Sequence, residues 1–123
     1  MLSVVIPCYN EGNKNIERAH QVITQLLDEN KIDHEMVFVN DGSADNTWES
    51  IENIIQKDQR VRGVNFSRNF GKEAALFAGL TYAKGDCCVT LDCDLQHPPK
   101  TIIEMYRLWE EGYEVIEGVK RTR

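Results

Sequence analysis

The chain contains 123 residues, of which 41% are hydrophobic and 28% are charged, and its formal net charge at pH 7 is −6. This length supports one hydrophobic core but not two ordinary domains. The acidic balance argues against a nucleic-acid partner, because binding to a phosphate backbone depends on clustered Lys and Arg. No apolar run approaches the roughly 20 residues that span a bilayer. We therefore expect a single soluble domain over residues 1–123.

The N-terminus and the cysteines indicate the cellular compartment. The first residues, MLSVVIPCYN, lack the basic leader and the cleavage site of a secretory signal, and they are predicted to form a buried strand instead. The cysteines follow neither the paired spacing of a zinc site nor the density of a disulfide-stapled domain. We expect a cytoplasmic protein with four reduced, mostly buried thiols: Cys8, Cys87, Cys88 and Cys93.

Short apolar segments alternate with helical patterns along the chain. Runs rich in β-branched residues predict strands buried on both faces, at residues 2–7, 35–40, 61–67, 87–92 and 115–119. A first helix is predicted to bury Ile16, Ala19, Ile23 and Leu27. A second is predicted to bury Trp48, Ile51 and Ile55. The third pattern, at residues 74–83, is apolar almost all round and predicts a helix buried deep against the sheet. The fourth helix is expected to open at Pro99 and to turn Ile102, Tyr106 and Trp109 inward.

This alternation predicts an α/β fold: a Rossmann-like, mostly parallel sheet with helices on both faces. Ligands of such sheets bind at the carboxyl ends of the strands. Polar motifs stand at these positions in the sequence. They are Tyr9-Asn10-Glu11, Asp41-Gly42-Ser43, Arg68-Asn69-Phe70-Gly71-Lys72 and Asp92-Cys93-Asp94.

The pair Asp92 and Asp94, with Gln96 beside it, offers oxygen ligands after the fourth predicted strand. Hard oxygen ligands at this spacing suit Mg²⁺ or Mn²⁺, which also bind the oxygens of a substrate diphosphate. An isolated pair of this kind is more often a solvated loop before a helix, because carboxylates are common in turns and near helix N-termini. The motif alone therefore leaves both interpretations open.

The other motifs also have two interpretations each. Asp41 could accept a hydrogen bond from the ring N–H of a base, or could belong to an ordinary capped turn. Pro7 and Tyr9 could wall the same pocket, or could be packing residues only. The two cations Arg68 and Lys72, around a Gly that begins a helix, are similar to an anion cradle but lack the P-loop spacing. A charged turn before a core helix is the alternative.

The segments IPCYNE, VNDGSADNT, SRNFGKEAALFAGL and LDCDLQHPP stand in this order at successive strand ends. Together they closely resemble glycosyltransferase family 2, and by motif the chain is most similar to the polyprenyl-phosphate branch with dolichol-phosphate mannose synthase. The resemblance implies the nucleotide-binding part of the GT-A fold. It also implies inverting transfer of a hexose from a UDP- or GDP-sugar to an acceptor, with polyprenyl phosphate expected and a saccharide as the alternative.

Residue by residue, the resemblance implies the following roles. Many members of the family have an acid where this chain has Asn40, and Ala where it has Cys93. Both departures leave the implied ligands in place. Asp92 would face the ribose or sugar and act in catalysis with Asp94. Asp94 and Gln96 would hold Mg²⁺ or Mn²⁺. The nucleotide would be surrounded by Pro7, Tyr9, Glu11, Asp41, Lys72, Asp92 and Cys93.

Family members continue past a basic stretch such as residues 120–123 into an acceptor-binding region, and often into membrane helices. The resemblance therefore implies that this chain stops before the acceptor side, with Arg121 and Arg123 as candidates for the diphosphate or a lipid phosphate. It implies a full-length protein at the cytoplasmic face of the membrane, attached only by segments absent here. Apolar surface left uncovered predicts a homo-oligomer. Two alternatives stay open: a nucleotide-binding module without turnover, and an aspartyl phosphatase, which is disfavoured because its motif usually follows the first strand.

Overall fold

The structure is a computed structural model that describes residues 1–95 and 100–112. The predicted alternation of strands and helices is confirmed over this part of the chain. Five predicted features lie outside it: the strand at 115–119, Pro99, Gln96, Arg121 and Arg123. The elements are β1 (Leu2–Cys8), α1 (Gly12–Glu29), β2 (His34–Asn40), α2 (Thr47–Lys57), β3 (Val61–Asn65), α3 (Lys72–Tyr82), β4 (Cys87–Thr90) and α4 (Lys100–Glu110).

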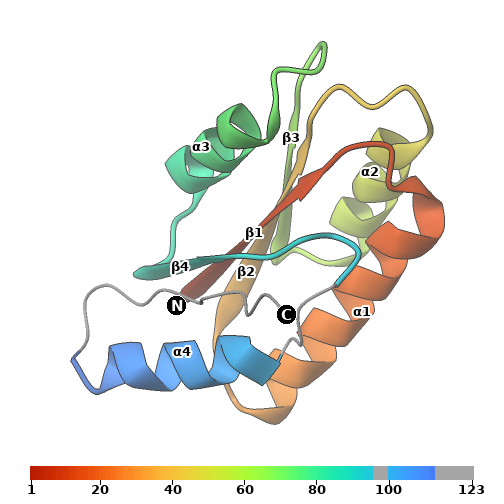
Figure 1. Cartoon of the computed structure of the whole chain (residues 1–123). Coiled ribbons are helices and arrows are strands. Elements are labelled where there is room, and N and C mark those ends of the chain that lie inside the picture. The colour runs from red at the N-terminus through yellow and green to blue at the C-terminus, as the bar shows by residue number, and fades with distance from the viewer. Residues whose placement is uncertain (96–99, 113–123) are drawn as a thin grey trace, which may run out of the picture.

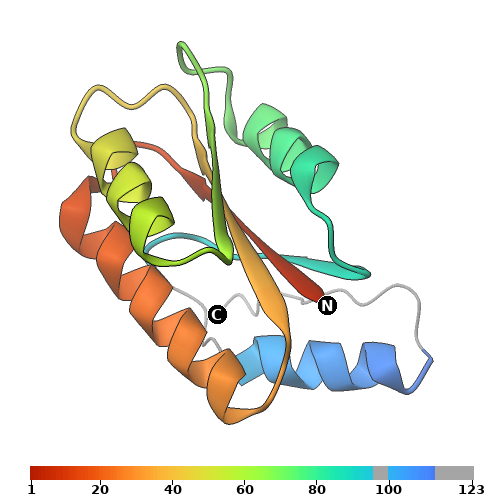
Figure 2. The same cartoon turned by 180° about the vertical axis from the view of Figure 1, so that it is seen from behind.

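The described strands form one parallel sheet in the order β3-β2-β1-β4. In this register Val5 of β1 pairs with Val37 of β2 on one side and with Thr90 of β4 on the other. Helices α1, α2 and α4 lie over one face, whereas α3 lies over the other (Figures 1 and 2). The predicted α/β class with helices on both faces is therefore confirmed.

The core forms between the sheet and the amphipathic helices on the first face. Every residue of α1 that was predicted to face inward is fully buried: Ile16, Ala19, Ile23 and Leu27. In α2, Ile51 is fully buried as predicted, while Trp48 and Ile55 are only partly buried against the same core. Ile54, on the next helical position, is buried in addition. In α4, Ile102 is buried and packs with Tyr106 against the core.

The prediction that the third helix is buried deep against the sheet is wrong. Only Ala75 and Gly79 of α3 are buried, and the side chain of Phe77 is 74% exposed. The helix rests on the sheet at Gly79, where a Cβ atom would overlap the Val5 side chain. An apolar pattern on all sides does not reveal how many sides are covered. Among the described elements, α3 is the only helix on its face of the sheet (Figure 2).

Two strands are shorter than predicted. β3 ends at Asn65 and β4 at Thr90, so the polar motifs begin in the loops after them, and the motif after β3 ends at Lys72, the first residue of α3. The four cysteines are free thiols, as expected. The prediction that they are mostly buried holds for Cys8 and Cys93 but fails for Cys88, which is exposed at the sheet edge.

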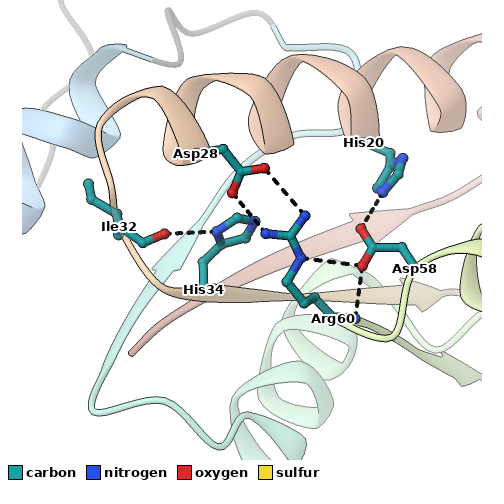
Figure 3. Close-up of polar contacts among 6 residues, drawn as sticks. All are labelled: His20, Asp28, Ile32, His34, Asp58 and Arg60. Carbon is teal, nitrogen blue, oxygen red and sulfur yellow. Dashed lines mark hydrogen bonds and ion pairs between the residues drawn. The ribbon is translucent and has the colours of Figure 1, made fainter.

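A polar network lies at the amino ends of the strands, opposite the motifs (Figure 3). His20 of α1 donates to the Asp58 carboxylate at 2.9 Å, and Asp58 also accepts from the Arg60 side chain at 3.3 Å. Arg60 donates in turn to Asp28 at 2.8 Å. The network joins α1 to the loop between α2 and β3.

In the described part of the chain, no helix combines the length and the apolarity that a bilayer span needs.

Candidate functional site

A pocket of about 270 Å³ opens at the carboxyl ends of β1, β2 and β4. This is the edge where an open parallel sheet binds its ligands. The pocket gathers every residue that the resemblance placed around a nucleotide, together with Asp94 and the unpredicted Cys8. Its lining consists of Pro7, Cys8, Tyr9, Glu11, Asp41, Lys72, Asp92, Cys93 and Asp94.

The loop after β1 is fixed by contacts to the loop after β2. The Asn10 backbone N–H donates to the Ser43 hydroxyl at 2.9 Å, and the Asn10 side-chain oxygen accepts from the Ala44 N–H at 2.8 Å. The Glu11 N–H donates to the Thr47 hydroxyl at 3.1 Å. These bonds hold the wall that contains Tyr9, whose side chain is half-exposed, against the end of β2.

Asp41 is buried at the end of β2 and is bound on both sides. Its backbone N–H donates to the Cys8 carbonyl at 2.8 Å. One carboxylate oxygen accepts from the Phe70 N–H at 2.8 Å, and the other accepts from the Asn69 side-chain amide at 3.2 Å. Asp41 therefore ties the loop after β3 to the end of β2. Whether it also accepts from a base, as predicted, stays a prediction.

Gly42 brings these two loops into backbone contact. Its φ of +65° is left-handed, and a Cβ atom there would lie 2.5 Å from the Arg68 carbonyl oxygen and closer still to the Asn69 nitrogen. A larger residue would strain the backbone and push the second loop away. Sequence reasoning identified Gly42 only as a turn residue.

Lys72, the first residue of α3, reaches across the pocket to the end of β4. Its ammonium lies 3.0 Å from an Asp92 carboxylate oxygen, and the two side chains are 64% and 35% exposed. The preceding Gly71 has a φ of 101°, which lets the chain turn sharply into the helix. Two motifs that are 20 residues apart in the sequence thus meet over the same pocket.

The turn after β4 separates its acids from its thiol. The Leu95 N–H donates to the Asp92 carbonyl at 3.0 Å and closes the turn. Cys93 is buried beside Cys8, while Asp92 and Asp94 are only half-buried. Burial and the neighbouring Cys93 thiol raise the pKa of Cys8, so Cys8 has little thiolate character and is a poor nucleophile.

Negative charge dominates the pocket. Among residues 1–95 and 100–112, its lining contains four carboxylic acids, Glu11, Asp41, Asp92 and Asp94, and one cation, Lys72. Burial raises the pKa of Glu11, and the charges of Asp94 and Asp92 raise it further, although a hydrogen bond from Asn15 opposes them. An added cation would relieve this repulsion.

The oxygen donors fit a divalent metal that is shared with a substrate. Within residues 1–95 and 100–112, no three His, Cys, Asp or Glu side chains gather closely enough to hold a metal ion by themselves. Mg²⁺ in enzymes is usually held by one or two carboxylates and completes its shell with water and substrate phosphates. Asp94, with Asp92 beside it, satisfies that requirement in a pocket with excess negative charge.

Comparison with known proteins identifies the family. The family model described as glycosyl transferase family 2 matches residues 3–123. This chain belongs to glycosyltransferase family 2. The resemblance that the four segments carried is thereby confirmed, over almost the whole chain.

Curated relatives of this glycosyltransferase domain are longer proteins. It is 43% identical over 122 residues to an uncharacterized glycosyltransferase of Synechocystis, covering 99% of this chain and 38% of the relative. It is 38% identical to the undecaprenyl-phosphate 4-deoxy-4-formamido-L-arabinose transferase of Proteus mirabilis, covering 99% and 37%. It is 36% identical to the bactoprenol glucosyl transferase of Shigella phage SfV, covering 99% and 39%. The chain thus spans less than two-fifths of these relatives.

A solved structure supports the same fold. The mannosyltransferase PcManGT from Pyrobaculum calidifontis, in complex with GDP-Man and Mn²⁺, superimposes with a TM-score of 0.64. The two sequences are 26% identical, and the match covers 76% of this chain and 27% of the other. Staphylococcus aureus TarS has the same fold, with a TM-score of 0.61 and 24% identity over 89% of this chain and 32% of the other.

Proposed function

We propose that the pocket binds the nucleoside diphosphate of a sugar donor, within a protein that transfers a hexose with inversion. The observation that carries the proposal is the convergence of three strand ends on one pocket, lined by all the residues expected around a nucleotide. The donor is a UDP- or GDP-sugar in this proposal. The solved mannosyltransferase with GDP-Man and Mn²⁺ supports a donor of this class.

We propose polyprenyl phosphate as the acceptor. Two of the relatives are named for undecaprenyl phosphate or bactoprenol, which supports an acceptor of this kind. A phosphate acceptor makes modest chemical demands, because its second pKa is about 6 and it is largely ionised near neutral pH. The site then needs no strong general base. Its task is to align the acceptor with the anomeric carbon. We propose that the reaction takes place in the cytoplasm, a reducing compartment in which free thiols such as those of this chain persist.

The residues of the pocket divide the work in this proposal. Asp94, with Gln96, would hold Mg²⁺ or Mn²⁺, which supplies neutralisation of the charge that develops on the leaving diphosphate. Tyr9 presents a half-exposed ring for the base or ribose. Asp92 would accept a hydroxyl hydrogen bond from the ribose or sugar.

Calorimetric titration with UDP, GDP, CDP and TDP, each with Mn²⁺ or Mg²⁺, tests the proposal. We expect one or two of these nucleotides to bind in a metal-dependent manner. Asp94→Asn should abolish the metal dependence, and it should leave the fold intact because a surface ligand contributes little to stability. The matched control is Asp33→Asn, an exposed acid at the opposite end of the sheet. Nucleotide affinity that is the same in Asp94→Asn and in the wild type would contradict the metal assignment.

A further inference from the structure

The exposed turn at residues 68–70 is held in place by a buried side chain. Arg68, Asn69 and Phe70 are all exposed, with the Phe70 side chain 51% exposed. Exposed turns without anchors are ordinarily mobile. Here Asp41, which is 4% exposed, accepts from two groups of the turn.

The anchor is specific and has several parts. The Asn69 side-chain amide donates to both the carboxylate and the carbonyl of Asp41, at 3.2 and 3.1 Å. The Phe70 N–H donates to the second carboxylate oxygen at 2.8 Å. Gly42 lets the Arg68 and Asn69 backbone approach as closely as it does. Hydrogen bonds to a charged acceptor such as this carboxylate are stronger than hydrogen bonds to a neutral one.

The Phe70 backbone nitrogen, which Asp41 anchors, lies two residues before Lys72. Two residues span at most about 7 Å, so fixing the Phe70 nitrogen also limits where α3 and its first side chain can begin. Lys72 is 64% exposed, and the only described partner of its ammonium is Asp92, at 3.0 Å. A long, exposed side chain loses considerable rotamer freedom when it is held over a pocket. If the backbone before it were not fixed, the Lys72 side chain would be less restricted to this position.

We propose that Asp41 is a positioning residue for phosphate recognition. It fixes the 68–70 turn so that Lys72, the single cation among the described lining residues, stands where the donor diphosphate arrives. This inference rests on the proposed function, and it gives Asp41 a role beyond any contact with the base. Each oxygen of the carboxylate accepts one hydrogen bond from the turn and keeps a second lone pair, so the anchor and a contact with a base are compatible.

The two roles differ in what an isosteric change does. Asp41→Asn keeps an oxygen for the Phe70 N–H but turns an NH₂ group toward the donating amide of Asn69. If Asp41 positions Lys72, affinity for Mn²⁺-pyrophosphate and for UDP, GDP and CDP with Mn²⁺ falls by a similar factor. We expect about tenfold, the usual effect of losing one charge-assisted hydrogen bond. If Asp41 only contacts the base, affinity for pyrophosphate stays unchanged and the nucleotides differ from one another.

A double-mutant cycle tests whether the effect passes through Lys72. Lys72→Met should weaken pyrophosphate binding by about tenfold, and adding Asp41→Asn to it should change the affinity by less than about twofold. Asn69→Ala leaves the carboxylate untouched and should reproduce the direction of Asp41→Asn. The control is Lys84→Met, an exposed lysine beyond the other end of α3 that does not line the pocket. Thermal unfolding of each variant separates loss of binding from loss of fold.

The outcomes distinguish this inference from the function beneath it. A wild-type chain that binds neither pyrophosphate nor any nucleotide would overturn both proposals. A wild-type chain that binds, combined with unchanged pyrophosphate affinity in Asp41→Asn, would overturn only the positioning role. Additive losses in the double variant would also overturn it, because Asp41 would then act independently of Lys72.

Discussion

Acidic side chains have different charged neighbours at the two ends of the sheet. At the amino ends of the strands, Asp58 and Asp28 lie against His20 and Arg60, and their pKa values are lowered. At the carboxyl ends, four acids share one pocket with one lysine, and the pKa of Glu11 is raised. Paired acids stabilise a fold, whereas crowded acids oppose it. Paired acids at the first end stabilise the fold, whereas the crowded acids at the second end suit the metal-bearing ligand that we propose.

At the amino ends of the strands, hydrogen bonds lower carboxyl pKa values more than burial raises them. Burial by itself would raise the pKa of Asp58, but hydrogen bonds from His20 and from the Arg60 backbone and side chain lower it overall. Glu35, on the other face of the sheet, follows the same pattern. Burial would raise its pKa, but donors from Ser3, the Lys84 N–H and Arg62 lower it.

The largest expected effect comes from breaking the carboxyl end at Gly42. Gly42→Ala should lower the free energy of unfolding by about 2–4 kcal/mol, because a Cβ atom would meet the Arg68 and Asn69 backbone at a residue with positive φ. Chemical denaturation measures the change, and Gly112→Ala is the control, since its φ is also positive but no described residue would lie within 4 Å of the added Cβ atom. Equal losses in the two variants would show that backbone strain alone matters.

The amino end should lose stability when its central acid is removed. Asp58→Asn should cost about 1–3 kcal/mol, because it deprives His20 and Arg60 of their charged acceptor in a partly buried position. Asp94→Asn is the matched change at the other end and should cost much less. Urea denaturation of both variants at pH 7 makes the comparison. A larger loss in Asp94→Asn than in Asp58→Asn would reverse our assignment of the two ends.

The two ends should also respond oppositely to acid. Asp58 has a folded-state pKa below its ordinary value of 3.8, so its contribution is present above that pH and is lost as the pH falls through the folded-state value. Glu11 has a folded-state pKa above 4.5, so its unfavourable contribution at neutral pH is relieved as the pH falls toward 4.5. Stability should therefore hold or rise slightly from pH 7 to about 5, and should fall below about 4. Asp58→Asn should flatten the fall, as measured by denaturation at each pH.

The smallest expected effect concerns Glu11, at the carboxyl ends of the strands. Glu11→Gln should leave the fold unharmed or stabilise it by up to about 1 kcal/mol at pH 7, because it removes one charge from beside Asp94 and Asp92. The same change should weaken metal-dependent nucleotide binding. Glu17→Gln, on the exposed side of α1, provides the control. A marked loss of stability in Glu11→Gln would mean that Glu11 is a structural acid.

The sequence predicted the elements better than their contacts. The buried face of α1 was predicted correctly, because its period of 3.6 residues leaves a single apolar stripe. α3 carries apolar residues on all sides, so its pattern did not reveal that Phe77 faces outward. The motifs follow successive strands, which placed them at one edge of the sheet, and the family resemblance then implied the individual pocket residues. Pairs such as Asp41 with Asn69, or His20 with Asp58, depend on how distant loops meet, and local patterns contain no information about that.

Thermal unfolding with and without ligand tests the central claim most directly. A ligand that binds only the folded state raises its stability by RT ln(1 + [L]/Kd), or about 2.7 kcal/mol at a hundredfold excess over Kd. We predict that Mn²⁺ with UDP or GDP raises the midpoint of the wild-type chain. We also predict that Asp94→Asn, without ligand, unfolds at the wild-type midpoint or above it and gains nothing from the same ligands. A wild-type midpoint that no metal and nucleotide shift, or an Asp94→Asn variant that is stabilised as strongly, would contradict a ligand role for the acids at the carboxyl ends of the strands.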